Sequence, residues 1–523
     1  MKTDTESLWF LAFAASKCES LSPSTAVILA FIFFLSCLIL NLVFWAHPGG
    51  PAWGKYKWRN PTSTKSRSSI PGPKGAPVIG SMNLMTGLAH HKIAAAAEAC
   101  GGKRLMAFSI GETRAIVTCN HEVAKEILNS ATFADRPANE TAYNLMFRSS
   151  IGFAPYGVYW QTLRKIISTH LFSPKQIKAS EYQRMEIASE MVSVFGSSRD
   201  GFSVRNVLKL ASLENMMFSV FGRRYGLCSV NSETEELSFL VDEGYDLLGK
   251  LNLADHLSFL TDFDVQKIRL RCSRLVPRVR KFVGRIVAEH KAETSKLNRD
   301  LVDVLLSLQG SDRLSEADMI AVLWEMIFRG TDTVAVLIEW ILARVVLHPD
   351  VQSKAHEELD RVVGRGRTVA ESDLSELVYL TAVIKEVLRF HPPGPLLSWS
   401  RLSIRDSTVD GYHVPAGTTA MVNMWAIMRD PAAWDDPLDF KPERFMNREL
   451  SVMGSDLRLA PFGSGRRSCP GKILGMTTVT YWVARLLHDI EFMASGPSVD
   501  LSEVLRLSCE MAHPLQIRAK LRR

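Results

Sequence analysis

The sequence predicts a mainly α-helical domain with a small β part, preceded by a transmembrane helix. Three observations support this fold class. Helical periodicity of apolar residues dominates the chain, one short pair of strand-like stretches is joined by Gly111-Glu112, and an uncharged apolar run lies near the amino terminus. There is no internal repeat, so we expect one domain over residues 81–523.

The expected elements follow in order along this domain. Residues 104–110 and 113–118 are rich in β-branched and apolar side chains and predict a hairpin. Pro/Gly-rich breaks such as 391–395 separate the helical stretches. The expected helices are 159–171, 182–195, 266–297, 316–346, 350–363, 374–390 and 471–487.

The amino-acid composition indicates a globular protein and argues against a nucleic-acid-binding one. The 523 residues are 46% hydrophobic and 22% charged, which is typical of a globular chain. The net charge is +7, but basic residues alternate with acids through most of the chain, which argues against nucleic acid as a partner. Eight cysteines are spread without CxxC pairs, so reduced thiols in a cytosolic environment are expected.

Residues 25–46 carry no charge. At about 1.5 Å per residue they are long enough to cross a bilayer core of roughly 30 Å, which predicts a transmembrane anchor after a short segment, 1–24. The alternative is a cleaved secretory signal. Against it, the apolar run exceeds a typical signal core, no basic region precedes it and no A-x-A site follows it.

Residues 47–80 form a basic, Pro/Gly-rich hinge. This stretch contains no acidic residue, and its basic residues include Lys55, Arg59 and Lys74. Positive charge next to a membrane helix favours the cytoplasmic side and attracts anionic membrane lipid. We therefore expect a single-pass protein with its large domain in the cytoplasm. Prolines at 71, 73 and 77 predict a stiff connector.

One cysteine has surroundings unlike the others. Residues 462–471 fit the pattern F-x-x-G-x-R-x-C-x-G, followed by an apolar helical stretch. Glycines allow a tight turn that brings amide N–H groups toward a sulfur and stabilises a thiolate. A lone buried cysteine is usually a packing residue, but five fixed positions in ten residues favour a metal-ligating thiolate. The positions are Phe462, Gly465, Arg467, Cys469 and Gly471.

This string resembles the cysteine motif of the cytochrome P450 superfamily. The resemblance implies the cytochrome P450 fold and a haem b (iron protoporphyrin IX) whose iron takes Cys469 as axial ligand. It implies that Phe462, Gly465, Arg467 and Gly471 also contact the cofactor. A monooxygenase of this kind uses O2 and NADPH-derived electrons, delivered by an NADPH-dependent cytochrome reductase at the endoplasmic reticulum membrane.

Two further stretches resemble the family's structural network. Glu386-x-x-Arg389 places two side chains on one helix face. Alone this spacing says little, but residues 440–445 (FKPERF) follow it and resemble the family's PERF segment. The resemblance implies that Glu386, Arg389 and Arg444 form a buried network, in which loss of one partner would cost about 3–5 kcal/mol.

Three residues resemble the family's propionate contacts. Trp160 and Arg164 lie one turn apart on one expected helix, and Arg401 follows the helix that contains Glu386. The alternative for the first pair is an amphipathic helix with a surface arginine. The resemblance implies that all three bind the haem propionates.

The expected helix 316–346 carries Gly330-Thr331-Asp332-Thr333, which resembles the oxygen-activation motif. An acid and an alcohol can relay protons into an apolar cavity, so Asp332 and Thr333 are the expected catalytic residues. Arg329 and Val334 depart from the usual pattern. The structural alternative is a Thr-Asp-Thr cap that separates two helices.

Several stretches resemble one plant group, family 78 subfamily A. They include 133–137 (FADRP), 153–160 (FAPYGVYW) and 328–335 (FRGTDTVA). The resemblance implies a role in plant growth or organ size, and fatty-acid hydroxylation as an activity. By the family's layout, the substrate cavity draws on 133–153, 326–334, 393–399 and 508–511. These stretches are mostly apolar, so a lipophilic small-molecule substrate is expected, with Arg136 or Arg148 holding a carboxylate.

Two other functions fit the same motifs less well. A haem-thiolate isomerase or dehydratase would not need O2, and such enzymes commonly lack the Asp332–Thr333 pair. A non-catalytic haem-binding sensor would have no need to retain every thiolate, propionate and proton-relay residue. The sequence therefore favours a monooxygenase, but it does not identify the substrate.

Overall fold

The structure is a computed structural model that describes residues 23–44, 70–197, 201–227, 232–292, 300–446, 448, 450–496 and 498–522. Nearly all of the predicted segment 1–24 lies outside the described residues, as do the last residues of the predicted anchor and residues 47–69 of the predicted hinge. The catalytic domain is almost fully described.

Helices make up most of the body. Their bounds are α2 (Pro23–Phe44), α4 (Ala89–Ala99), α5 (His121–Asn129), α6 (Glu140–Asn144), α7 (Val158–His170), α8 (Pro174–Ala179), α9 (Glu181–Ser197), α10 (Val204–Phe221), α11 (Ser232–Gly249), α12 (Ile268–Ala292), α13 (Leu301–Ser307), α14 (Glu316–Leu347), α15 (Pro349–Val362), α16 (Val378–Phe390), α17 (Met424–Ile427) and α18 (Lys472–Asp489).

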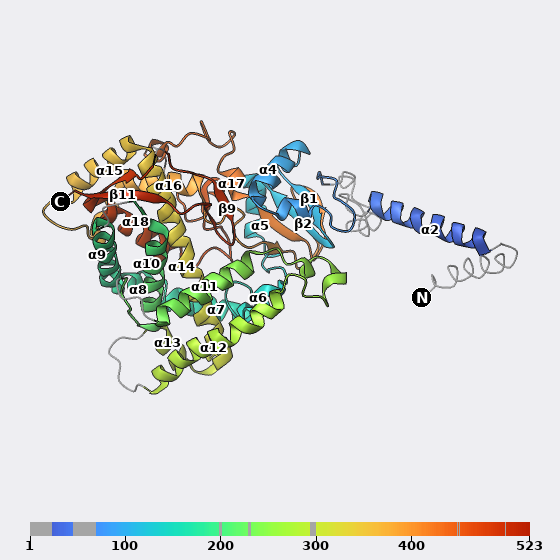
Figure 1. Cartoon of the computed structure of the whole chain (residues 1–523), viewed down its shortest axis with the longest axis horizontal. Helices are drawn as coiled ribbons and strands as arrows, with labels where there is room; N and C mark the ends of the chain where they lie inside the picture. The colour runs from blue at the N-terminus through green and yellow to red at the C-terminus, as the bar shows by residue number, and fades with distance from the viewer. Residues whose placement is uncertain are drawn as a thin grey trace.

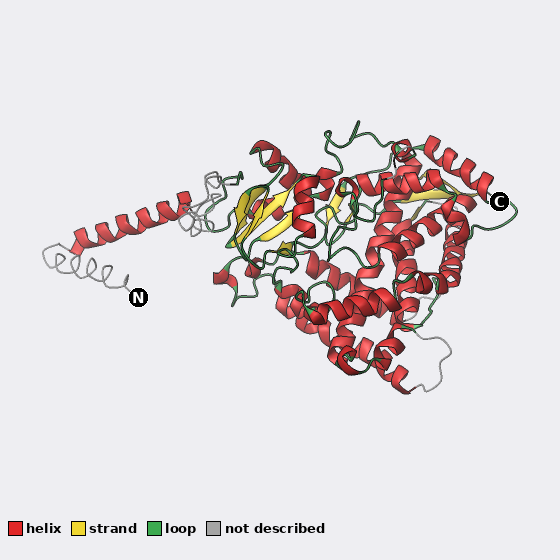
Figure 2. Ribbon diagram, turned by 180° about the vertical axis from the view of Figure 1, so that it is seen from behind, coloured by secondary structure: helices red, strands yellow, loops and turns green. Residues whose placement is uncertain are grey.

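The strands are short. They are β1 (Met106–Ile110), β2 (Thr113–Thr118), β3 (Phe202–Ser203), β4 (Arg401–Leu402), β5 (Ser407–Val409), β6 (Tyr412–Val414), β7 (Thr419–Val422), β8 (Ile490–Ala494), β9 (Glu503–Leu505), β10 (Cys509–Met511) and β11 (Gln516–Leu521). Figure 2 shows how small the yellow β part is beside the red helices, so the predicted mainly α fold is confirmed.

Helix α14 is the longest helix in the described part of the chain, and it lies at the centre of the helix packing. It is 32 residues long, and most of its side chains between Met319 and Val346 are buried. It packs against α10, α12, α16 and α18, and the two largest apolar clusters both include its side chains. Figure 1 shows α9, α10, α15 and α18 gathered on one side of the body, with α4, β1 and β2 on the other.

The predicted hairpin is present. Strands β1 and β2 pair antiparallel around Gly111, with Met106 opposite Val117 and Ile110 opposite Thr113. The pattern could not show that β2 also pairs in parallel with β7, about three hundred residues later. The helices between β2 and β7 return the chain to the same sheet. Its strand order is β1-β2-β7-β4.

The predicted helices agree with α7, α9, α12, α14, α15 and α18 to within a few residues where they are described. The expected helix 374–390 begins later, because residues Glu371–Ser375 form a separate 3-10 turn before α16 starts at Val378. The Asp373 carboxylate accepts the Ala370 amide N–H at 2.9 Å and holds that turn. Several helices were not predicted, namely α4, α5, α6, α8, α10, α11, α13 and α17.

The end of the predicted hinge, residues 70–80, contacts the β part of the body. Ile70 is buried, and the Ala107 amide donates to the Pro71 carbonyl at 2.8 Å. Gly80 pairs with Ile110 at the edge of the sheet. The end of the predicted hinge is therefore attached to the β part of the body.

Helix α2 overlaps the predicted anchor and lies apart from the body in Figure 1. Its side chains from Val27 to Ile39 are mostly exposed. Within the described residues, no helix has both the length and the apolar character that crossing a membrane requires.

Candidate functional site

A cavity of about 270 Å³ lies between α10, α14, α18 and the segments 393–401 and 461–471. Its wall is mostly apolar, with residues such as Val334, Leu337 and Leu397. Cys469 and Thr333 both line it, although 136 residues separate them in sequence. The cavity therefore brings the predicted thiolate together with the alcohol of the predicted proton relay.

The cysteine segment is shaped by its glycines. Gly463 and Gly465 have φ angles of +68° and +70°, which favour glycine. A Cβ on Gly465 would lie 2.1 Å from the Leu128 carbonyl oxygen, so a side chain does not fit. The Cys469 amide donates to the Phe462 carbonyl at 3.0 Å and closes the loop directly before α18.

The Cys469 side chain is half-buried and lines the cavity. Burial raises the pKa of its thiol, while a hydrogen bond from the Gly471 amide and the charge of Arg329 act in the opposite direction. A bound cation would favour the thiolate further, because metals select the deprotonated sulfur. Because Cys469 lines the cavity, its sulfur lies where it could reach a bound metal.

Arg136, Arg164, Arg401 and Arg467 are four of the five arginines that line the cavity. Burial is the main cause that lowers the pKa of each of them, to about 9 for Arg401 and about 10 for Arg467. Their mutual repulsion acts in the same direction for Arg136 and Arg401. Asp135 lies 3.8 Å from Arg467 and offsets one of these charges.

This cationic cluster fits a dianionic ligand. Arg164 donates to the Ser468 carbonyl at 2.7 Å, and Arg401 donates to the Ser464 carbonyl at 3.2 Å, so both are held beside the cysteine loop. Carboxylates pair well with such buried guanidinium groups. The two propionates of a haem would fit this donor set, and Cys469 could supply a sulfur ligand to its iron.

Trp160 does not line the cavity, but it packs against Arg467, which does. Its indole N–H donates to the Ile151 carbonyl at 2.9 Å, and its ring lies 4.5 Å from the Arg467 guanidinium carbon. Arg467 in turn donates to the Ala134 and Ala154 carbonyls. In this structure Trp160 therefore supports Arg467 from behind, whereas a direct indole contact with a propionate stays a prediction.

The motif on α14 lies within one continuous helix, so the alternative of a cap between two helices is wrong. The Thr331 hydroxyl donates to the Ile327 carbonyl at 2.8 Å and does not face the cavity. Gly330 lies against α10, where an added Cβ would be 2.4 Å from the Met216 sulfur. Close helix packing is thus a second reason for glycine here.

Asp332 faces away from the apolar part of the cavity toward Lys209 of α10. Its Oδ1 lies 3.3 Å from Lys209 Nζ, which is also 3.3 Å from the exposed carboxylate of Asp242. Burial would lower the pKa of Lys209, but the two aspartates raise it above its ordinary value. A charged path therefore leads from the surface to Asp332, next to Thr333.

The structure brings Glu386, Arg389 and Arg444 together. Arg389 Nε and Nη2 donate to the two Glu386 oxygens at 2.8 and 2.9 Å, and both side chains are fully buried. Arg444 Nε donates to Glu386 at 3.1 Å. Arg389 also donates to the Met428 and Pro437 carbonyls, which joins α16 to the segment before the cysteine loop.

Sequence reasoning missed a polar group in the cavity wall. Glu325 Oε1 accepts hydrogen bonds from Arg329 at 3.0 Å and from the Gly152 amide at 2.8 Å. The Arg329 guanidinium carbon lies 5.1 Å from the centre of the Trp399 ring. All four residues line the cavity. The unusual Arg329 was the available signal, but its partners are remote in sequence.

Two other expectations about the cavity are wrong for the described residues. Residues 508–511 do not line it, because Ser508 and Cys509 lie in and beside the β9–β10 pair. Arg148 does not line it either, and its guanidinium lies over the Tyr143 ring at 5.7 Å. Arg136 does line it, but its guanidinium donates to the Trp399 and Ser400 carbonyls.

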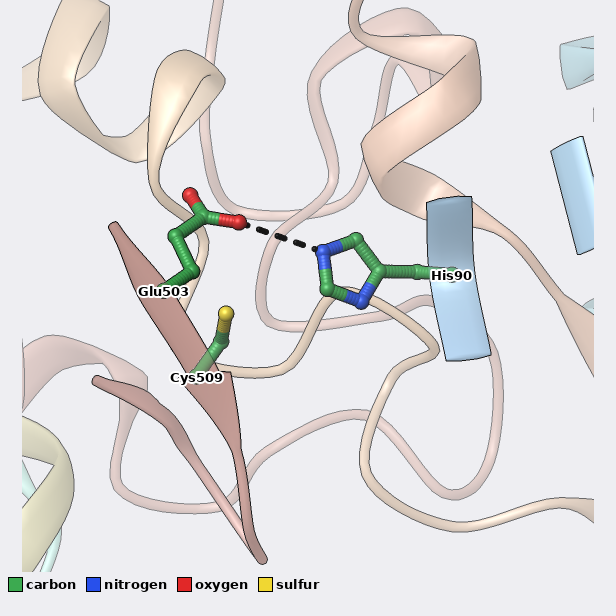
Figure 3. A group of neighbouring side chains, drawn as sticks. All are labelled: His90, Glu503 and Cys509. Carbon is green, nitrogen blue, oxygen red and sulfur yellow. Dashed lines mark hydrogen bonds and ion pairs between the residues drawn. The ribbon is translucent and has the colours of Figure 1, made fainter. Parts of the chain in front are cut away.

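A second cluster of titratable groups lies outside the cavity. Figure 3 shows Glu503 of β9 and Cys509 of β10 facing His90 of α4, and one ligand atom from each lies within 4.8 Å of the others. Glu503 also accepts from His391 Nδ1 at 3.1 Å. The opposite His391 nitrogen accepts from Arg344, so His391 must donate to Glu503. This cluster is a buried hydrogen-bond network that ties α4, α16 and β9 together.

This network predicts loss of stability in acid. Burial lowers the pKa of His391 to about 4. Burial opposes ionisation of Glu503, but hydrogen bonds from His391 and His90 hold its pKa well below the ordinary value. In both cases the unfolded chain binds its proton at the higher pH, so the stabilisation is complete above about pH 6.5 and falls as the pH decreases. Thermal unfolding from pH 7.5 to 4 should show a falling midpoint.

The variant Glu503→Gln isolates one contribution to this effect. It should lower the midpoint at pH 7, because His391 and His90 lose a charged acceptor, and it should flatten the curve below about pH 4.5. An acid profile as steep as that of the unaltered chain would contradict the role of Glu503.

Comparison with known proteins gives consistent matches. The cytochrome P450 family model matches residues 70–504. Cytochrome P450 78A3 of Glycine max is 62% identical over 99% of both chains, and Cytochrome P450 78A9 of Arabidopsis thaliana is 61% identical over 100% of this chain and 99% of its own. A solved zebra fish cytochrome P450 with progesterone has a TM-score of 0.71 at 25% identity, covering 83% of this chain and 99% of its own.

Proposed function

The chain belongs to the cytochrome P450 family and is a haem-dependent monooxygenase, and from this premise we propose that it inserts one oxygen atom of O2 into a lipophilic small molecule. The observation that carries the proposal is one cavity whose wall includes Cys469, Thr333 and the four arginines Arg136, Arg164, Arg401 and Arg467. Bound haem would supply the iron that activates O2.

In this proposal each residue of the site has a distinct role. Cys469 ligates the iron, and Phe462, Gly465 and Gly471 shape the loop that presents the sulfur. Arg164, Arg401 and Arg467 bind the propionates, with Trp160 behind Arg467. The apolar wall excludes water and orients the substrate.

Proton delivery is assigned to Thr333 and Asp332. Thr333 lines the cavity. Asp332 pairs with Lys209, which also pairs with the exposed Asp242, so charged groups connect Asp332 to the surface. A hydroxyl beside a carboxylate can pass protons to the reacting oxygen, which an apolar wall cannot do.

The variant Thr333→Ala should therefore lower product formed per NADPH oxidised, by roughly a hundredfold for a lost proton-transfer group. Thr331→Ala is the matched control, because its hydroxyl is bonded to the Ile327 carbonyl and does not line the cavity. Equal losses in both variants would contradict the assignment.

The proposed setting is the endoplasmic reticulum membrane. The uncharged stretch 25–46 would anchor the chain, and the basic hinge would lie on the cytoplasmic side. An NADPH-dependent cytochrome reductase would supply the electrons, docking its acidic surface on the Cys469 side, where Arg466 is exposed.

The proposed substrate is lipophilic, since the cavity wall is mostly apolar. The likeness to relatives of subfamily 78A extends this proposal to a role in plant growth or organ size, with a fatty-acid-like molecule as one candidate substrate.

Reconstituted protein and reductase, incubated with a plant lipid extract, provide the test. We expect oxygenated products that require NADPH, detected by mass spectrometry. A normal haem spectrum without any such product would favour an isomerase, a dehydratase or a sensor over the monooxygenase.

A further inference from the structure

The cluster of His90, Glu503 and Cys509, which lies outside the cavity, combines nitrogen, oxygen and sulfur ligand atoms. One such atom from each residue lies within 4.8 Å of the others. The three side chains come from α4, β9 and β10 and face one another in Figure 3. His90 and Cys509 are buried, and the Glu503 side chain is 10% exposed. Imidazole, carboxylate and thiolate are the groups with which proteins bind zinc.

His91, the next residue on α4, offers a fourth ligand atom. His90 Nε2 and His91 Nε2 each lie 3.4 Å from the same oxygen, Glu503 Oε2. This distance exceeds the usual N–H···O hydrogen bond of about 2.7–3.2 Å. It agrees with the separation of about 3.4 Å between two ligand atoms on a tetrahedral zinc ion whose bonds are about 2.0–2.2 Å long. The two contacts therefore have the spacing of zinc ligands.

Neighbouring groups orient these ligand atoms. Glu503 Oε1 accepts from His391 Nδ1 at 3.1 Å, which leaves Oε2 directed at the two other histidines. The Trp425 ring stacks on His91, with ring centroids 4.2 Å apart. Metal-ligating carboxylates are usually held by an outer hydrogen bond of this kind. The His91 side chain is 42% exposed, so a metal ion can enter past this ring.

Cys509 completes the ligand set by losing its proton. Burial raises the pKa of this thiol, so the sulfur is protonated while no metal is bound. As a Zn–S bond forms, the thiol proton passes to solvent. A sulfur bonded to zinc at about 2.3 Å lies about 3.6 Å from the other ligand atoms, which is within the observed 4.8 Å limit. The thiolate and the Glu503 carboxylate balance the charge of the ion, which offsets repulsion from the nearby Arg429.

We propose that His90, His91, Glu503 and Cys509 bind one Zn²⁺ ion in a structural site that joins α4 to the β9–β10 pair. The inference goes beyond the proposed monooxygenase function and does not depend on it. Without zinc, the side chains keep their hydrogen-bond network. With zinc, the two long contacts of Glu503 Oε2 are replaced by bonds to the metal, and the hydrogen bond from His391 remains.

The test measures zinc in the full-length haem protein, produced in cells grown with added zinc sulfate. Only protein with the carbon monoxide band of a thiolate-ligated haem is used, so that Cys469 is occupied by iron. Dialysis against EDTA at neutral pH removes zinc from the surface. We then expect one zinc ion per haem iron by mass spectrometry of the elements. X-ray absorption at the zinc edge should show one sulfur at about 2.3 Å and nitrogen or oxygen atoms at about 2.0–2.2 Å.

Two variants assign the zinc to these residues. Cys509→Ala and His90→Ala should each lose the zinc that resists EDTA, because each removes a ligand atom from the ion. The matched control is Cys119→Ala. Cys119 is also buried and free, but it does not belong to the cluster, so this variant should retain the zinc and its sulfur ligand. If a variant does not fold with haem, X-ray absorption of the unaltered protein carries the test.

Three results would overturn the site. They are removal of all zinc from the unaltered protein by EDTA, which would mean an adventitious ion only, a zinc first shell without sulfur, and equal retention of zinc by Cys509→Ala and Cys119→Ala. Failure of the monooxygenase proposal would look different, because it would leave no NADPH-dependent products from a lipid extract whatever the zinc content.

Discussion

A Cys469→Ala protein is expected to lose the red-shifted absorption band of the carbon monoxide complex that a thiolate-ligated haem produces. Alanine offers no ligand atom, and Cys469 is the cysteine that lines the cavity. Product formation should fall by more than the roughly 10–100-fold that follows loss of a residue supporting a metal ligand. The measurements are the reduced carbon monoxide difference spectrum and NADPH-dependent turnover.

Cys100→Ala is the matched control. Cys100 is also half-buried and free, but it lies at the end of α4 and does not line the cavity. Its spectrum and turnover should equal those of the unaltered protein. A Cys469→Ala protein that kept the red-shifted band would overturn the assignment of the axial ligand and, with it, the placement of the active site.

The second large effect is expected at Arg389. An Arg389→Met variant leaves the fully buried Glu386 with one of its two arginine partners, and it removes donors from the Met428 and Pro437 carbonyls. Breaking a buried pair on one side costs about 3–5 kcal/mol. We expect the free energy of unfolding to fall by that amount, measured by denaturant titration, with loss of bound haem.

The comparison for this variant is Lys250→Met. Lys250 pairs with Asp246 at 2.7 Å at the carboxyl end of α11, and both side chains are more than 40% exposed. An exposed pair of this kind contributes less than about 1 kcal/mol, so stability and haem content should hardly change. Similar losses in both variants would mean that burial of the Glu386–Arg389 pair has no special role.

The local motifs could be recognised in the sequence because the residues that carry their chemistry lie close together along the chain. The segment from Phe462 to Gly471 combines turn residues, a cation and a thiol within ten positions, so the pattern predicts both the loop and its ligand atom. The helical periodicity of α14 likewise predicts the element that carries Thr333. Each of these predictions depends on the types of residue and on their spacing in the sequence.

Trp160 and Arg401 show the limit of that approach. Spacing puts the Trp160 indole one turn from Arg164, but the indole N–H is taken by the Ile151 carbonyl, and the ring contacts Arg467 instead. Arg401 becomes part of the cavity because β4 pairs with β7. Neither arrangement can be derived from neighbours in sequence.

The sequence by itself predicted the reaction class, through its family motifs, the thiolate ligand and the helical character of the domain, because these depend on residue types at short spacing. Tertiary structure decided the rest. Packing of α10 against α14 places Lys209 beside Asp332 and requires Gly330. Contact between α14 and the segment at Gly152 holds the Glu325 carboxylate in the cavity wall. Such contacts join residues more than a hundred positions apart, and the free energy of packing, which no local pattern encodes, selects them.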